Sequence, residues 1–158
     1  MHNMRKRFID VRSEEPLGGD WLDVSKVAQV EITSEDKAHP IESALLSASS
    51  LGWRAADAGP QTIRLLFDKP QDFRRIRLDF EEIEIARTQE FVLRWSPEAG
   101  KPRHEIVRQQ WNFSPPGTVH ETEDYKVRLS GVTILELEIV PDKSGGDARA
   151  SLLSLRLA

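Results

Sequence analysis

Cysteine and histidine, the residue types most typical of zinc sites, are absent or scarce in this chain. It has no cysteine, which excludes disulfides, thiolate nucleophiles and cysteine-based metal sites. Its histidines are scattered, and no two of them stand at the spacing of a zinc site. They are His2, His39, His104 and His120. We therefore expect no metal and no other cofactor.

Carboxylates and serines are more numerous, but their patterns do not indicate catalysis. Acidic residues cluster at 81–84 and 121–124, whereas glycoside hydrolysis needs two carboxylates facing each other across a cleft. Charged strand ends and loops account for both clusters. No serine stands in a Gly-x-Ser-x-Gly elbow, and the turn at 144–147 lacks the lysine of a phosphate-binding loop. The sequence predicts that the protein is not an enzyme.

Three aromatic side chains and one histidine are candidates for binding a ligand. Trp95 shares a strand face with Phe91 and Leu93, so we expect it in the core. Trp53 and Trp111 lie at or beside predicted loops, where each ring is either a stacking platform or a plug for the end of the core. His39, before a proline, is either a ligand contact or an ordinary loop residue.

The elements that must position these residues are strands. Between turns rich in Gly, Pro and Ser, apolar residues alternate with polar ones, as expected for sheets with one buried face. Two such sheets must cover each other, so the pattern predicts an all-β sandwich. Only the stretch 41–51 has helical spacing. The alternating residues are Ile63, Leu65 and Phe67; Ile76, Leu78 and Phe80; Phe91, Leu93 and Trp95; Tyr125, Val127 and Leu129; Leu135, Leu137 and Ile139; and Leu153, Leu155 and Leu157.

Length and charge limit the domain organisation and the partners. The 158 residues are enough for one core, and we expect one domain over 21–158 preceded by a loosely ordered arm, residues 1–20. A net charge of −4 argues against nucleic-acid binding, and Arg75 and Arg77 should pair on a sheet face with Asp79. The chain has neither a secretory signal nor an apolar span of membrane length. We therefore expect a cytoplasmic protein without membrane insertion.

The order of these segments resembles that of the discoidin-like domains, which include coagulation-factor C-type domains and bacterial carbohydrate-binding modules. The resemblance covers residues 21–158. It consists of a Trp after a helical turn, a strand ending in the Phe-x-x-Pro of 67–70, then Arg87 leading into the strand 91–96. It continues with the strand 135–141, a loop and the closing strand 150–157.

The resemblance implies an antiparallel jelly-roll β-sandwich of the galactose-binding type that binds ligands through loops at one end, without catalysis. Most such ligands are saccharides, lipid head groups or proteins. The rings would stack, and the Arg and Asn side chains would bind sugar hydroxyls. The residues implied as ligand-binding are His39, Trp53, Arg54, Arg87, Trp111, Asn112, Asp147 and Arg149.

One part of the family pattern is missing. Many relatives hold a structural calcium with an Asp-Gly pair after an Ala-Leu and with a late Glu, but here Ala44-Leu45 is followed by Leu46-Ser47, and the late position is Ser154. We therefore expect no calcium site. The sequence favours two hypotheses, a carbohydrate-binding module and a cytoplasmic protein-interaction domain that uses the same loops or a sheet face. A third, a hydrolase, has no motif in its favour and would need two carboxylates or a Ser-His pair converging in a pocket. The sequence carries no signal for an oligomeric state.

Overall fold

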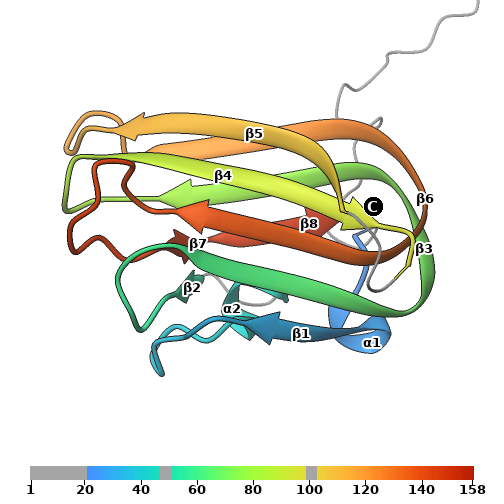
Figure 1. Cartoon of the computed structure of the whole chain (residues 1–158). Coiled ribbons are helices and arrows are strands. Elements are labelled where there is room, and N and C mark those ends of the chain that lie inside the picture. The colour runs from blue at the N-terminus through green and yellow to red at the C-terminus, as the bar shows by residue number, and fades with distance from the viewer. Residues whose placement is uncertain (1–20, 47–50, 99–102) are drawn as a thin grey trace, which may run out of the picture.

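Two antiparallel layers of one bent, six-stranded sheet face each other in this protein, as the all-β prediction requires (Figure 1). The computed structural model describes residues 21–46, 51–98 and 103–158. The predicted N-terminal arm, 1–20, lies outside the described residues. The main strands are β1 (Ala28–Ile32), β3 (Gln61–Glu81), β4 (Arg87–Ser96), β5 (His104–Phe113), β6 (His120–Val140) and β8 (Ser154–Leu157).

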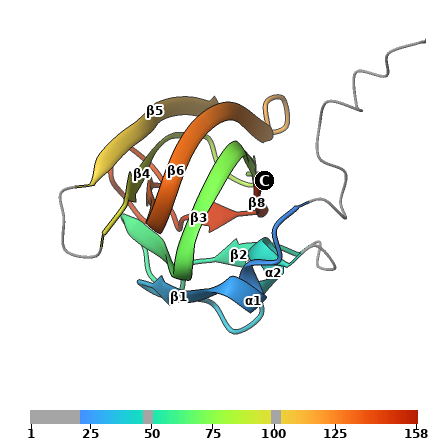
Figure 2. The ribbon, with the colours of Figure 1, turned by 90° about the vertical axis from the view of Figure 1, so that its right-hand side faces the viewer.

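β3 and β6 each belong to both layers. The first half of β3 pairs with the second half of β6 in a layer ordered β1-β3-β6-β4-β5. The second half of β3 pairs with β8 on one side and with the first half of β6 on the other. Figure 2 looks onto the end of the sandwich where the two strands cross together between the layers. The chain therefore passes from one layer to the other within β3 and within β6, without an intervening loop.

The crossing corrects one expectation from the sequence. Two of the turns rich in Gly, Pro and Ser that the sequence predicts between strands are Lys69-Pro70 and Ser130-Gly131, but these residues lie inside β3 and β6. The register shifts between Leu66 and Arg75, as at a β-bulge. Gly131 has a φ of 68°, and its N–H donates to the Asp72 carboxylate at 2.8 Å. Pro70 and Gly131 thus bend the strands rather than end them.

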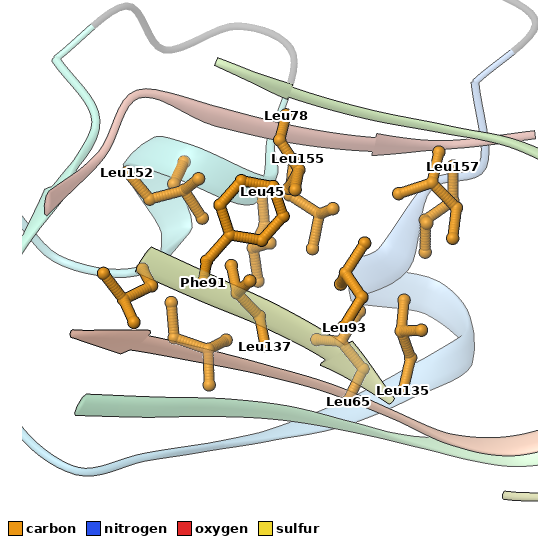
Figure 3. Packing of buried hydrophobic residues seen from close by; sticks show 14 of the residues in the cluster. Leu45, Leu65, Leu78, Phe91, Leu93, Leu135, Leu137, Leu152, Leu155 and Leu157 are labelled. Atoms are coloured by element: carbon orange, nitrogen blue, oxygen red, sulfur yellow. The ribbon is translucent and has the colours of Figure 1, made fainter. Parts of the chain in front are cut away.

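The core fills the space between the layers with alternate residues of the strands (Figure 3). Residues 63, 65 and 67 of β3 are buried while the residues between them are partly exposed. The same alternation holds for 76, 78 and 80, as predicted, whereas in β6 residues 135, 137 and 139 are buried but Glu136 between them is buried as well. Trp95 is half-buried and packs against this core.

Short elements close one side of the sandwich. They are α1 (Val24–Val27), α2 (Glu42–Leu45), β2 (Trp53–Arg54) and β7 (Ser151–Leu152). The predicted closing strand is broken at Leu153, so Leu152 is buried instead of Leu153, and β7 pairs with β2 while β8 pairs with β3. The predicted helix is confirmed only as α2, and residues 47–50 lie outside the described residues.

Arg77 pairs with Asp79, as predicted, whereas Arg75 pairs with Asp124. Arg77 lies 3.4 Å from the Asp79 carboxylate. Arg75 is buried and forms an ion pair with Asp124, while the ring of Trp21 lies 5.6 Å from its guanidinium carbon. No helix among residues 21–46, 51–98 and 103–158 is long and apolar enough to span a membrane.

Candidate functional site

A pocket of about 520 Å³ opens at one end of the sandwich. Loops 82–86, 114–119 and 141–150 meet at this end, on the left in Figure 1, and we call it the loop end. The Glu82 N–H donates to Val119 O, and the Lys143 N–H donates to Thr88 O, both at 2.8 Å. Residues of β2, β7, loop 82–86 and loop 141–150 line the pocket, together with His39 and Leu51.

One wall of the pocket is the ribbon formed by β2 and β7. Trp53 pairs with Leu152, and both side chains point into the core with 1% and 0% exposure. Because faces alternate along a strand, Arg54 projects outward. Arg149 projects on the same side, two residues before the partner of Arg54. Neither guanidinium has a hydrogen bond or ion pair with another described residue.

The close approach of β2 to β7 depends on Gly52. Its φ is +73°, and a Cβ at this position would lie 2.8 Å from the carbonyl oxygen of Leu152. Only glycine fits such an approach without a shift of the backbone. The Trp53 indole then donates to Ser34 O at 3.0 Å, which fixes the ribbon to the chain after β1.

The opposite wall is loop 82–86, which the Glu82 carboxylate organises. One of its oxygens accepts from the N–H groups of Glu84 at 2.9 Å and Ile85 at 3.4 Å. The other accepts from Arg87 Nε at 2.8 Å. Burial favours the neutral acid, but the hydrogen bonds from Glu84 and Arg87 outweigh it, so the pKa of Glu82 lies below its usual range. The loop therefore carries a fixed carboxylate at its base.

The rim of the pocket is apolar. Three large hydrophobic side chains are exposed among the described residues, Leu51 at 67%, Ile83 at 65% and Ile85 at 44%, and all three line this pocket. Single exposed apolar residues are ordinary, but their concentration around one concavity is typical of a binding surface. The side chains of Glu84 and Asp147, also without described partners, lie among them.

The pocket brings together five of the eight residues implied by the resemblance. They are His39, Trp53, Arg54, Asp147 and Arg149. Of the two alternatives for Trp53, the structure shows core packing, because its ring is buried and no face is free for stacking. His39 is half-exposed, and its Nδ1 lies 3.9 Å from the Asp36 carboxylate.

Three of the eight residues lie outside the pocket. The side chain of Arg87, predicted to meet a ligand from a loop, is instead fully buried at the start of β4, and its ligand role stays a prediction. Trp111 is half-buried on β5 and packs against the core. Asn112, also on β5, is exposed and accepts from the Thr88 hydroxyl at 2.8 Å.

Sequence reasoning missed the contribution of Ile83 and Ile85. A signal was present, because the buried residues at the end of β3 are even-numbered, namely Ile76, Leu78 and Phe80, whereas these two isoleucines are odd-numbered. A change of phase means that the strand has ended or that the apolar residues point outward. Here both are true.

The pocket contains carboxylates but no arrangement typical of a hydrolase or a metal site. Within the described parts of the chain, no group of three or more His, Asp and Glu side chains is placed to hold a metal ion. Glycoside hydrolysis uses a carboxylic acid with a raised pKa. The carboxyl group whose pKa rises to about 7 is that of Glu121, which is buried and does not line the pocket.

Comparison with known proteins identifies the fold. No model of a known protein family matches the chain, and no curated protein matches it significantly. Similar solved structures include the family 32 carbohydrate-binding module of C. perfringens NanJ in complex with galactose, with TM-score 0.59, 15% identity, and coverage of 87% of this chain and 96% of that one. Another is CBM32-3 from a family 31 glycoside hydrolase of Clostridium perfringens, with TM-score 0.60, 17% identity and coverage of 95% and 98%.

A third similar structure has a protein partner. It is reduced XRCC1 bound to the DNA pol beta catalytic domain, with TM-score 0.59, 13% identity and coverage of 84% of this chain and 96% of that one. At these identities the likeness establishes the fold alone. The chain thus has the galactose-binding-like β-sandwich fold of the discoidin-like domains, which confirms the predicted resemblance in fold.

Proposed function

Since the fold is that of the discoidin-like domains, we propose that the protein binds a saccharide, without catalysis, in the pocket at the loop end. The observation that carries this proposal is the composition of the pocket, where charged groups without partners among the described residues lie beside exposed apolar side chains. Saccharide binding needs this combination, because polar groups bind the hydroxyls and apolar surface covers the C–H faces of the ring.

The two walls would have different roles in the complex. Arg54 and Arg149 would donate hydrogen bonds to hydroxyl or carboxylate oxygens, and Glu84 would accept from hydroxyls. The aliphatic side chains of Ile83 and Ile85 would cover a C–H face. Aromatic stacking is not part of the proposed mode, because Trp53 is the one Phe, Trp or Tyr among the described residues that line this pocket, and its ring is buried.

The state of the pocket carboxylates favours binding over hydrolysis. Both oxygens of Glu82 are occupied by groups of the protein, and its pKa is lowered rather than raised. The Asp142 carboxylate accepts from the backbone and hydroxyl of Ser144, which also lowers its pKa. A general acid for glycoside cleavage needs the opposite shift.

A glycan array, followed by calorimetry on the strongest saccharide, tests the proposal. We expect Arg54→Ala to weaken binding about tenfold, the value of one hydrogen bond to a charged group. Arg128→Ala is the matched control, because Arg128 is also exposed without a described partner but lies on β6 and does not line the pocket. An array without a positive saccharide, or equal losses in both variants, would contradict the proposal.

A second candidate function is protein binding through the same pocket. The aliphatic nature of the rim favours it, because exposed Leu and Ile side chains more commonly contact other apolar side chains than sugars. The likeness to XRCC1 shows that this fold also occurs in a protein with a protein partner.

Substitution of the rim separates the two candidates. Ile83→Asp should abolish a protein complex reconstituted from purified components, whereas it should reduce saccharide affinity by less than the Arg54 change. A partner purified from native cells that binds Ile83→Asp and unchanged protein equally would count against this second candidate.

A further inference from the structure

Arg87 connects the core of the sandwich to both loops that form one side of the pocket. It is the first residue of β4, directly after loop 82–86, and its side chain is completely buried. Its Nε donates to Glu82 Oε1 at 2.8 Å, which reaches loop 82–86. Its Nη1 donates to the carbonyl oxygen of Pro141 at 2.8 Å, which holds the start of loop 141–150.

The guanidinium itself is held in place by the core. Nη1 also donates to Gln89 Oε1 at 3.1 Å. The Phe113 ring, directly across the β4–β5 ladder, lies 4.8 Å from the guanidinium carbon. Gln89 in turn donates to Glu121 on β6 at 3.1 Å. Strands β4, β5 and β6 therefore all fix the orientation of this one side chain.

Glu82 links the buried Arg87 side chain to the part of loop 82–86 that lines the pocket. Its carboxylate joins Arg87 to the N–H groups of Glu84 and Ile85, the residues that present a carboxylate and an apolar side chain to the pocket. Without the guanidinium, the carboxylate would lose its bond to β4, and the turn at Glu84 and Ile85 would lose its side-chain link to the core.

We propose that Arg87 is a positioning residue, which sets the shape of the pocket by fixing loops 82–86 and 141–150 to β4 and does not itself contact the ligand. This inference rests on the proposed function for its link to binding, whereas the fixing of the loops is independent of any ligand. Lysine cannot replace this residue, because a single ammonium group on a flexible chain does not reproduce the planar fork that binds Glu82, Pro141 and Gln89.

A spin label on loop 82–86 measures the positioning directly. The chain has no cysteine, so Glu84→Cys gives a unique attachment site, and Asp57→Cys, on the exposed turn before β3, gives a control site. In the Arg87→Lys background we expect the rotational correlation time at position 84 to fall at least about twofold, while that at position 57 stays unchanged.

The matched control for the substitution is Arg64→Lys. Arg64 also donates to two carboxylates, those of Glu31 and Glu136, but it does not line the pocket. The label at position 84 should not respond to it. An unchanged label in Arg87→Lys, or equal changes in both lysine variants, would overturn the proposal.

A second variant covers the case in which Arg87→Lys does not fold. Glu82→Ala removes the connection from the loop side, where the side chain is 15% exposed, and keeps the bonds of Arg87 to Gln89 and Pro141. It should mobilise the label at position 84 to a similar extent. An immobile label in this variant would contradict the role of Glu82 as the link.

The glycan array then tests the link to binding. We expect Arg87→Lys to reduce the signal of unchanged protein about tenfold and Arg64→Lys to preserve it. Equal signals from both variants would refute the effect on binding. An array without signal for the unchanged protein contradicts the proposed function instead, and the spin-label result still decides whether Arg87 positions the loops.

Discussion

Glu121 has a carboxyl group inside the sandwich, on the first half of β6 opposite Phe80, with 1% exposure. One of its oxygens accepts from Gln89, and the other has no partner among the described residues. Burial raises the pKa of this carboxyl to about 7, and repulsion from Glu123 adds to the rise, while the Gln89 hydrogen bond and the charge of Arg87 oppose it. The substitution Glu121→Gln removes the titration and preserves the size of the side chain.

The raised pKa of Glu121 determines whether the free energy of unfolding rises or falls with pH. Below pH 4.5, the ordinary value for this group, the carboxyl is protonated in the folded and the unfolded chain, and ionisation costs no stability. As the pH rises towards 7, the unfolded chain ionises while the folded chain retains its proton, so the free energy of unfolding falls. A pKa raised from 4.5 to about 7 corresponds to a loss of about 3 kcal/mol.

Urea unfolding at intervals from pH 4.5 to 8, followed by tryptophan fluorescence, measures this loss. The free energy of unfolding of Glu121→Gln, minus that of the unchanged protein, should increase by about 3 kcal/mol across this range and level off above pH 7. Other titrating groups cancel in the difference, because both proteins contain them. A difference that is independent of pH, or one that decreases as the pH rises, would refute the assignment of the buried acid.

The backbone and the core provide further tests. Gly52→Ala should destabilise the fold by about 3 kcal/mol or more, because the new Cβ meets Leu152 O at 2.8 Å. Gly59→Ala, which has a φ of +88° and open space around it, should cost only about 1 kcal/mol, and equal urea midpoints for the two variants would contradict the steric argument. Phe113→Ala should cost about 3 to 5 kcal/mol by opening a cavity beneath Arg87, and calorimetry showing a melting temperature close to that of the unchanged protein would count against this packing. Ile83→Ser should leave the melting temperature within about 2 °C, because the side chain is 65% exposed, while it weakens saccharide binding, and unchanged calorimetric affinity would remove the rim from the proposed site.

The sandwich was predictable from the sequence because its strands are half-buried. When one face of a strand packs and the other meets solvent, apolar and polar residues alternate, and this pattern is local in sequence. The bends at Pro70 and Gly131 were not distinguishable from turns, because a turn and a bulge use the same residue types. A bulge is distinguished from a turn only by the pairing of β3 with β6 on both sides of the bend.

The candidate site was less predictable because burial there depends on contacts between distant residues. The ring of Trp53 is buried against Leu152, and its indole reaches Ser34, 19 residues earlier. Arg87 is held by Pro141, 54 residues away along the chain. Loop positions alone could not reveal either environment.

The predicted cytoplasmic location stays a prediction.

Chemical-shift mapping tests the central claim, saccharide binding at the loop end, most directly. The labelled protein would be titrated with the strongest saccharide of the glycan array, and the backbone amide shifts followed by NMR. We predict shifts concentrated at Arg54, in loop 82–86 and at 145–151, with β1 and the bend at 68–72 unaffected. Shifts centred on those distant segments, or on the outer face of a sheet, would contradict the account.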